Sequence, residues 1–284
     1  MDTNRKSAVL ILAAASICAA ANSDWLKPFP PHKVIGNVYY VGSNYLASYL
    51  ITTPAGNILI NPSYSESVPL IRDAMAKLGF RMEDVKILLI SHAHDDHAAG
   101  CALFKKLSGA KLMVMEQDVP VVEGGGAGDF AYTSRWAPAK VDRVLHDGDT
   151  VSLGGEVLTA RLTAGHTKGC TTWTWQAKDG GKTYNVVVVG SPNVNPGFKL
   201  VNNAKYPAIA EDYARSFRMW KSLPCDVFLG AHGVYYGLDE KYPKLKAGGA
   251  NPFIDPAGYK AYIAERQAEF ERKLADQRAG KPAE

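Results

Sequence analysis

Four side chains able to bind a metal ion or carry a proton stand close together in the pattern H-x-H-x-D-H. They are His92, His94, Asp96 and His97, and they directly follow the apolar run from Val85 to Ile90. In an extended backbone the first two histidines point to the same side, and a turn into a following helix can aim Asp96 and His97 at a neighbouring point. Imidazole and carboxylate suit Zn²⁺, and hydrolytic sites often hold two ions about 3.5 to 4 Å apart. The run therefore predicts two adjacent metal sites.

Two further histidines lie in glycine-flanked loops, each shortly after an expected strand. His166 follows the run from Val157 to Leu162, and His232 follows the run from Val227 to Leu229. Small neighbours let a loop approach an ion closely, and loops at strand ends are common places for functional residues. A zinc pair needs more ligands than the H-x-H-x-D-H run supplies, so we expect both histidines to join the site.

The remaining histidines and one aspartate have plainer interpretations. His32 and His146 are expected to be structural or exposed. Asp95 is expected to be solvated, or to support the ligands through hydrogen bonds, rather than to bind metal itself.

The overall composition indicates a globular chain. It has 284 residues, of which 46% are hydrophobic and 21% are charged, and its formal net charge is +4. These values exclude a disordered chain, a collagen-like repeat and a coiled coil. Lysine and arginine together number 32 against 28 acidic residues, with no basic run longer than a pair, so nothing indicates a nucleic-acid partner.

The first residues resemble a secretory leader. Arg5 and Lys6 precede an apolar run from Ala8 to Ala21 that ends in small residues. The run is shorter than the roughly 20 residues a membrane-spanning helix needs. We therefore expect a signal peptide over residues 1–21 and a single catalytic domain over residues 22–284, periplasmic or secreted and with no membrane attachment after leader removal.

Three cysteines follow the leader, and none belongs to a C-x-x-C pair. The expected role is that of small buried hydrophobic side chains, with metal or redox work as the alternative. Because their number is odd, at least one must stay free or pair between chains. They are Cys101, Cys170 and Cys225.

Strand-like and helical patterns alternate through both halves of the chain. Similar hairpins at residues 45–61 and 171–189 suggest two β halves closed face to face with helices outside. The expected strands cover residues 34–41, 45–52, 57–61, 85–90, 111–115, 144–145, 150–153, 157–162, 171–176, 185–189 and 227–229, and the expected helices cover residues 67–78, 98–107, 211–221 and 256–279.

A glycine-rich loop at residues 123–128 precedes several aromatic residues. It is either a mobile flap or a plain solvent loop. Three aromatic side chains could line an apolar rim around the cleft, or could simply pack in the core or in loops. They are Trp25, Phe130 and Trp136.

These motifs make the chain resemble the metallo-β-lactamase superfamily, and more narrowly the third subclass of class B β-lactamases. The resemblance covers essentially the whole chain after the leader. It implies an α+β fold of the αββα sandwich type. Besides the H-x-H-x-D-H run, it rests on Gly165-His166-Thr167, on Thr171 to Trp175, on Asn195 to Leu200, on Tyr206-Pro207 and on Leu223 to Val227.

The resemblance also implies how the ligands divide between two Zn²⁺ ions. His92, His94 and His166 would hold one ion, while Asp96, His97 and His232 would hold the other. Many relatives in the superfamily, including glyoxalase II and lactonases, carry a bridging aspartate at the place where this chain has Gly190-Ser191. The zinc-binding cysteine of the first two lactamase subclasses is also missing there, and Ser191 fits the third.

One departure concerns the sulfur atoms. The third subclass often pairs the cysteine matching Cys225 with one in the terminal helix, where this chain has Gly258-Tyr259. The usual disulfide is therefore not expected.

The implied activity is hydrolysis of β-lactam antibiotics, which would confer antibiotic resistance. A zinc-bound hydroxide, oriented by Asp96, would attack the lactam carbonyl while one zinc polarises the carbonyl oxygen and the other stabilises the departing nitrogen. Ser191 and Asn195 are candidates for binding the substrate carboxylate, and both could instead be turn residues. We expect a monomer acting on a small-molecule β-lactam: a penicillin, a cephalosporin or a carbapenem.

Two alternatives stay open at this stage. One is another dinuclear zinc hydrolase of the same fold, acting on a thioester, a lactone or a phosphodiester. The other is a zinc-binding protein without catalytic activity, although a storage site has no need for two ligand sets of different composition.

Overall fold

The computed structural model describes residues 25–283. The predicted signal peptide, residues 1–21, lies outside them. Within the described part, no helix combines the length and the apolar character needed to cross a membrane.

The first of two β-sheets has 7 strands in the order β1-β2-β3-β4-β5-β6-β7. Strands β1 to β4 pair antiparallel, and β4 to β7 pair parallel. Parallel neighbours need a crossover connection, which helices supply between β4 and β5 and between β5 and β6. The strands are β1 (His32–Ile35), β2 (Val38–Tyr40), β3 (Tyr49–Thr53), β4 (Gly56–Ile60), β5 (Val85–Leu89), β6 (Lys111–Met115) and β7 (Arg143–Leu145).

The second sheet has 5 strands in the order β12-β11-β10-β9-β8. Its pairs are antiparallel except β11 and β12, which lie parallel with a helix as the crossover between them. The strands are β8 (Thr150–Leu153), β9 (Glu156–Leu162), β10 (Thr171–Asp179), β11 (Lys182–Val189) and β12 (Val227–Gly230).

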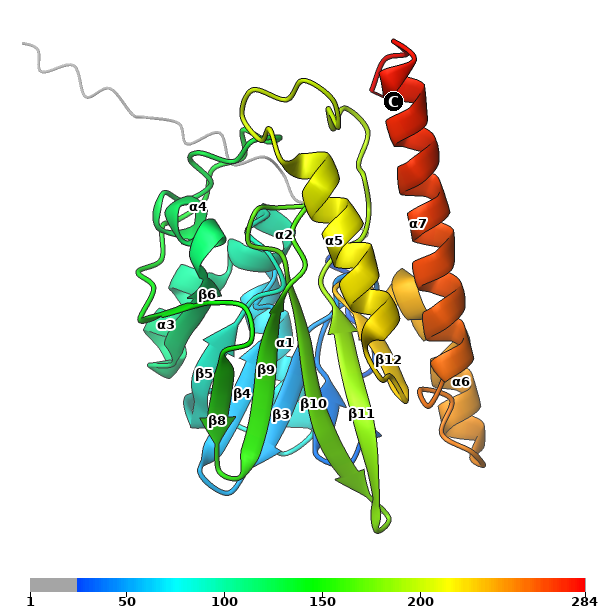
Figure 1. Cartoon of the computed structure of the whole chain (residues 1–284). Coiled ribbons are helices and arrows are strands. Elements are labelled where there is room, and N and C mark those ends of the chain that lie inside the picture. Colours follow the sequence, from blue (N-terminus) through cyan, green and yellow to red (C-terminus); the bar gives the residue numbers. More distant parts are fainter. Residues whose placement is uncertain (1–24, 284) are drawn as a thin grey trace, which may run out of the picture.

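Helices cover the outer faces of the two sheets, and Figure 1 shows the strands between α3 and α4 on one side and α5 and α7 on the other. The α-helices are α1 (Ser67–Lys77), α2 (Asp95–Ala98), α3 (Cys101–Ser108), α4 (Val119–Glu123), α5 (Ile209–Ser222), α6 (Leu238–Ala247) and α7 (Pro256–Arg278). Short 3-10 helices are η1 (Met82–Asp84), η2 (Glu116–Asp118) and η3 (Gly233–Tyr236).

Two apolar cores hold these layers together. The larger core joins the sheets, with Tyr49 of the first and Trp173 of the second both buried in it, and it continues to Phe217 of α5. The smaller core packs Ile71 of α1 and Phe104 of α3 against the outer face of the first sheet. Helix, sheet, sheet and helix therefore form four layers, which confirms the predicted αββα sandwich.

Several predicted boundaries were wrong for local reasons. The expected strand 34–41 is a hairpin, because the backbone turns at Gly36 with φ of 50°, where a Cβ would lie 2.5 Å from the carbonyl oxygen of Lys178. The expected strand 45–52 begins only at Tyr49, and the expected helix 98–107 corresponds to α3, which begins only at Cys101 because α2 ends at Ala98. Helix α6 was not predicted, because Pro243 interrupts its pattern.

The strands that carry the candidate ligands end at one edge of the sandwich. Hydrogen bonds between the two halves fix this edge: the Thr171 N–H donates to the Ser91 carbonyl at 2.7 Å, and the Trp173 indole N–H donates to the Ile90 carbonyl at 3.0 Å. The Tyr49 hydroxyl donates to the Gly230 carbonyl at 2.7 Å, close to the end of β12. Loops that leave β5, β9, β11 and β12 are thereby brought to the same region.

His32 is a structural residue, as its sequence context predicted. It is 8% exposed, its ring lies 5.4 Å from that of Tyr40 and 5.7 Å from that of Phe253, and its Nδ1 meets the Pro30 carbonyl at 2.9 Å. Burial lowers the pKa of His32 below its usual value, against the opposing effect of the Pro30 hydrogen bond. The folded state therefore favours the neutral ring.

We expect this burial to make His32 a source of acid sensitivity. Because its pKa is lower in the folded chain than in the unfolded one, its contribution to stability is present above about pH 6.5, the ordinary histidine value, and is lost as the pH falls below it. In His32→Phe, the free energy of unfolding should fall less between about pH 8 and pH 5 than in the wild type. Denaturant unfolding of both proteins measures this, and parallel pH curves would contradict it.

Candidate metal centre

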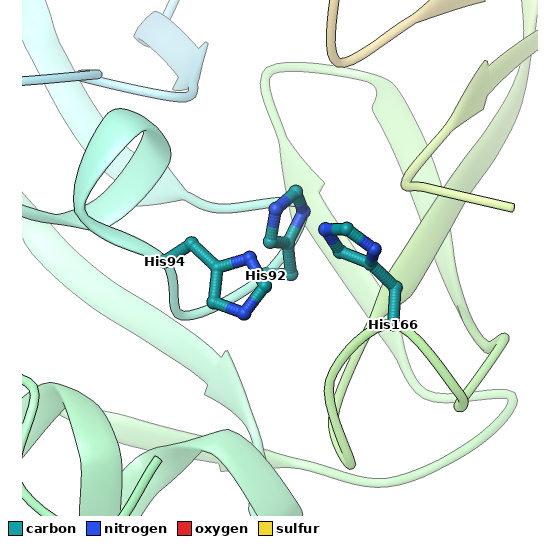
Figure 2. Close-up of side chains that lie close together, drawn as sticks. All are labelled: His92, His94 and His166. Carbon is teal, nitrogen blue, oxygen red and sulfur yellow. The ribbon is translucent and has the colours of Figure 1, made fainter. Parts of the chain in front are cut away.

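Three histidines from two loops face one another at the edge of the sandwich. His92 and His94 lie on the loop after β5, and His166 lies on the loop after β9. All three are buried, and one ring nitrogen from each lies within 4.8 Å of the others. Figure 2 shows the three rings gathered around one point. We call these residues the histidine triad.

Polar neighbours on the far side of each ring leave one ring nitrogen free for a ligand. The Nδ1 of His92 meets the Ser91 hydroxyl at 3.1 Å, and the Nδ1 of His166 meets the Asn193 carbonyl at 2.9 Å, so both keep Nε2 for a ligand. The Nε2 of His94 instead lies 3.4 Å from a carboxylate oxygen of Asp129, which leaves its Nδ1. Such partners orient imidazoles in metal sites.

A second group of side chains converges beside the histidine triad. The Oδ2 of Asp96 lies 3.1 Å from the Nε2 of His97 and 3.5 Å from the Nε2 of His232, and these two nitrogens are 3.2 Å apart. We call Asp96, His97 and His232 the Asp–His–His triad. His92 also has a ligand atom within 4.8 Å of those of Asp96 and His97, so the two triads are adjacent.

The electrostatics of both triads suit a bound cation. Burial is the main cause that lowers the pKa of His92 well below its usual value, and the neighbouring histidines add to this effect. Burial also lowers the pKa of His166, and it lowers the pKa of His232 to about 3. Burial alone would raise the pKa of Asp96, but His97 and His232 bring it below its ordinary value. His92, His166 and His232 therefore have neutral rings with a free lone pair, and Asp96 is an ionised carboxylate.

The donor chemistry of the two triads fits zinc. One triad offers three imidazole nitrogens, and the other offers two imidazoles and a carboxylate oxygen, which are the ligand types that Zn²⁺ prefers in enzymes. The Nδ1 atoms of His97 and His232 are buried and have no hydrogen-bond partner among the described residues. Every ligand candidate named from the sequence is brought together here.

A cavity of about 340 Å³ opens beside both triads. Its volume lies within the range of small-molecule sites. Aromatic and polar side chains surround the metal-binding groups, and the lining residues are Trp25, Tyr45, Tyr64, His94, Asp95, Asp96, Tyr132, Ser134, His166, Asn193, Asn195, His232 and Tyr235.

The two candidates for binding a substrate carboxylate lie in different surroundings. Asn195 lines the cavity and donates an Nδ2 hydrogen to the hydroxyl of Tyr132 at 2.7 Å. Ser191 is fully buried, and its hydroxyl lies 3.2 Å from that of Tyr235, so it reaches the cavity only through that tyrosine. Tyr235 and Asn193 line the cavity themselves and are hydrogen-bonded at 3.0 Å.

The loop after α4 contributes Tyr132, a residue that the sequence analysis did not single out. The ring of Tyr132 lies 4.8 Å from that of His94. One oxygen of the Asp129 carboxylate accepts the N–H groups of Ala131 and Tyr132, each at 2.6 Å, and the other oxygen faces His94. A single carboxylate therefore ties the loop to a candidate metal ligand.

Of the three aromatic residues considered for an apolar rim, one lines the cavity and the other two pack against neighbouring residues. Trp25 lines the cavity and stacks on Tyr45 with ring centroids 4.6 Å apart. Phe130 packs on Phe198 at 5.1 Å instead. Trp136 packs against the glycine-rich loop, where a Cβ on Gly126 would meet its ring at 2.5 Å.

Asp95, His146 and the three cysteines belong to neither triad. The Asp95 carboxylate accepts the N–H of Asp96 at 2.9 Å, and the side chain of His146 is 63% exposed. Cys101 and Cys170 are buried, Cys225 is half-buried, and none of the three forms a disulfide.

Comparisons with known proteins agree with this geometry. The sequence profile of the Metallo-beta-lactamase superfamily matches residues 44–232. The native FEZ-1 metallo-beta-lactamase from Legionella gormanii is 53% identical, with 89% of this chain and 98% of that chain covered and a TM-score of 0.88. The class B3 di-zinc metallo-beta-lactamase LRA-12 from an Alaskan soil metagenome is 36% identical, with 90% and 98% covered and a TM-score of 0.86.

A curated relative of another activity matches over a shorter region. A hydroxyacylglutathione hydrolase of Acidiphilium cryptum is 28% identical over 139 residues. The match includes 49% of this chain and 47% of that protein, so the chain covers about half the length of this relative.

Proposed function

The chain belongs to the metallo-β-lactamase superfamily and is a hydrolase of the metallo-β-lactamase type, and from this premise we propose that it uses two zinc ions to open the ring amide of β-lactam antibiotics. The observation that carries the proposal is the histidine triad and the Asp–His–His triad sharing one cavity. The similarity to FEZ-1 and LRA-12 over about nine-tenths of this chain supports the same substrate class.

Each triad would hold one ion. The histidine triad would bind the first zinc, and the Asp–His–His triad the second. When bound, the ions supply Lewis acidity and bring the pKa of a coordinated water to about 7.

Asp96 supplies the negative charge of the site. Its lowered pKa keeps the carboxylate ionised at neutral pH, so the carboxylate can accept a hydrogen bond from the attacking water. This hydrogen bond orients a lone pair of the water oxygen toward the lactam carbonyl. In the reaction, the water oxygen joins the carbonyl carbon, the ring C–N bond breaks, and the released nitrogen takes a proton. No covalent bond to a side chain is needed.

Asn195 and Tyr132 are placed to orient the substrate. An amide nitrogen carries two hydrogens, and Asn195 gives one of them to Tyr132, so the other can bind the carboxylate beside the lactam ring. The Tyr132 hydroxyl accepts from Asn195 and keeps its own hydrogen for a substrate oxygen. Ser191 would act indirectly, by holding Tyr235.

Thioester hydrolysis is the second candidate, because of the partial match to a hydroxyacylglutathione hydrolase. The end of β11 separates the two. At that place the chain has Gly190-Ser191, with no carboxylate to bridge two ions. We therefore propose β-lactams rather than thioesters as the substrate class.

A substrate panel tests the proposal. We expect the purified enzyme to hydrolyse at least one penicillin, cephalosporin or carbapenem, to lose this activity with a zinc chelator, and to regain it when zinc is restored. A thioester of glutathione is assayed in parallel. Thioester turnover without lactam turnover would favour the second candidate, and lactam turnover insensitive to chelation would contradict the zinc mechanism.

Tyr132→Phe should lower kcat/KM for a β-lactam about 10- to 100-fold, because a hydrogen bond to a charged group contributes about 1.5 to 3 kcal/mol and each 1.36 kcal/mol is a factor of ten. Zinc content should be unchanged, since the variant keeps the ring beside His94. Steady-state kinetics and metal analysis measure both. Tyr39→Phe is the control, because Tyr39 packs on Phe80 away from the cavity. Equal kinetics for the two variants would exclude a role for the Tyr132 hydroxyl.

A further inference from the structure

A buried carboxylate joins the two loops of the histidine triad. Asp118, at the end of η2, is 2% exposed. One of its oxygens accepts the Ala93 N–H at 2.8 Å and the Thr167 hydroxyl at 2.8 Å, and its other oxygen accepts the Gly169 N–H at 2.8 Å. Ala93 lies between the first two histidines of the triad, and Thr167 directly follows the third.

The loops close tightly around this side chain. A Cβ on Gly169 would lie 2.6 Å from the backbone nitrogen of Asp118 and 2.7 Å from its side-chain carbon atoms. Only glycine allows this approach, so the loop of His166 is fitted directly onto the carboxylate. The contact leaves neither loop free to shift without breaking a hydrogen bond to Asp118.

Within residues 25–283, no lysine or arginine forms an ion pair with the Asp118 carboxylate. Burial raises the pKa of Asp118, and the three hydrogen bonds and His94 oppose this effect. Buried charges in proteins are usually paired or coordinate a metal. A cation at the neighbouring triad would supply the missing positive charge.

We propose that Asp118 is a positioning residue of the metal centre, which holds the His92–His94 loop and the His166 loop at the spacing that the first zinc requires. It touches neither the substrate nor the ion, and it acts through its three hydrogen bonds. The inference rests on the proposed zinc site, and it adds a residue that the ligand pattern alone does not include.

Asp118→Asn tests the role at nearly constant volume. An amide has one oxygen and one NH₂ group, so whichever way it turns, its NH₂ group faces the N–H of either Ala93 or Gly169. We expect zinc affinity to fall about 10- to 100-fold, the range found when such supporting partners of metal ligands are changed. Competition with a chromogenic chelator measures the affinity, and the visible spectrum of the cobalt-substituted protein reports the ligand geometry.

Asp226→Asn is the matched control. Asp226 also accepts a backbone N–H, from Asn185 at 2.8 Å, but it lies at the start of β12, at the end opposite His232. Both variants should lower the free energy of unfolding of the metal-free chain, and only Asp118→Asn should change zinc affinity and the cobalt spectrum. Wild-type affinity in Asp118→Asn, or an equal loss in both variants, would overturn the proposal.

Thr167 provides a second route if Asp118→Asn does not fold. Thr167→Val removes one donor to the carboxylate, and Thr167→Ser keeps it. We expect weaker zinc binding in the valine variant and near wild-type binding in the serine variant; no difference between them would count against Asp118. A wild type that binds zinc without hydrolysing β-lactams would refute the proposed substrate class and leave this inference standing.

Discussion

His94→Ala should lower kcat/KM for a β-lactam by at least about 10³-fold, because a Lewis acid supplies several kcal/mol to such a reaction and each 1.36 kcal/mol is a factor of ten. The variant removes one of the three imidazoles of the histidine triad. It also removes the ring that meets Asp129 and Tyr132, so the wall of the cavity changes with the ligand set.

Zinc content should fall in His94→Ala while the fold stays largely intact, since the core between the sheets does not depend on this side chain. Metal analysis after dialysis, circular dichroism and steady-state kinetics measure the three properties. His146→Ala is the control, because His146 is exposed, belongs to neither triad and is not among the residues that line the cavity. Full activity in His94→Ala would remove the basis of the metal mechanism.

Asp96→Asn should lower kcat about 10²- to 10⁴-fold, the range contributed by a positioned acid or base. The amide cannot carry the negative charge that His97 and His232 favour at this position. It is also a poorer zinc ligand than a carboxylate, so we expect about one zinc ion per chain to be lost on dialysis.

Asp95→Asn separates this effect from local backbone changes. Asp95 lines the same cavity, but its carboxylate accepts the N–H of Asp96 and belongs to neither triad. We expect its kcat to stay within a few-fold of the wild type, the size of effect that one neutral hydrogen bond produces. If Asp96→Asn kept two zinc ions and the wild-type kcat, Asp96 would be neither a ligand nor a base.

The candidate ligand set could be predicted from the sequence because most of it is local. The H-x-H-x-D-H run fixes His92, His94, Asp96 and His97 relative to one another through the end of a strand and the start of a helix. His166 and His232 could be found because each follows an apolar strand and has glycine neighbours.

The supporting residues could not be found in this way, because each depends on contacts between distant segments. Asp118 meets loops on both sides of the sandwich, and Tyr132 meets Asn195 across the cavity. Ser191 was expected to lie in the cavity but does not reach it directly. Its place just after β11 suggested a cavity position, but the register of that strand buries its hydroxyl against Tyr235.

The fold was predicted well where periodicity was uninterrupted. Strands such as β6 and β8 were found with their observed bounds, and the helix predicted at residues 256–279 corresponds to α7. Errors arose where one residue changes the path of the chain, as at Gly36, or where Pro243 lies inside a helix. Local composition does not reveal whether a packed environment will tolerate such a residue.

If the substrates are β-lactams, as proposed, Asp129 has a consequence for how the range of hydrolysed antibiotics could change under selection. Its carboxylate holds the backbone at Ala131 and Tyr132 and also faces the ring of His94. A mutation of Asp129 that reshapes the loop for a bulkier drug would also disturb the candidate metal ligand His94. Variants with altered drug preference should therefore arise more readily at Ser134, which lines the same cavity and belongs to neither triad.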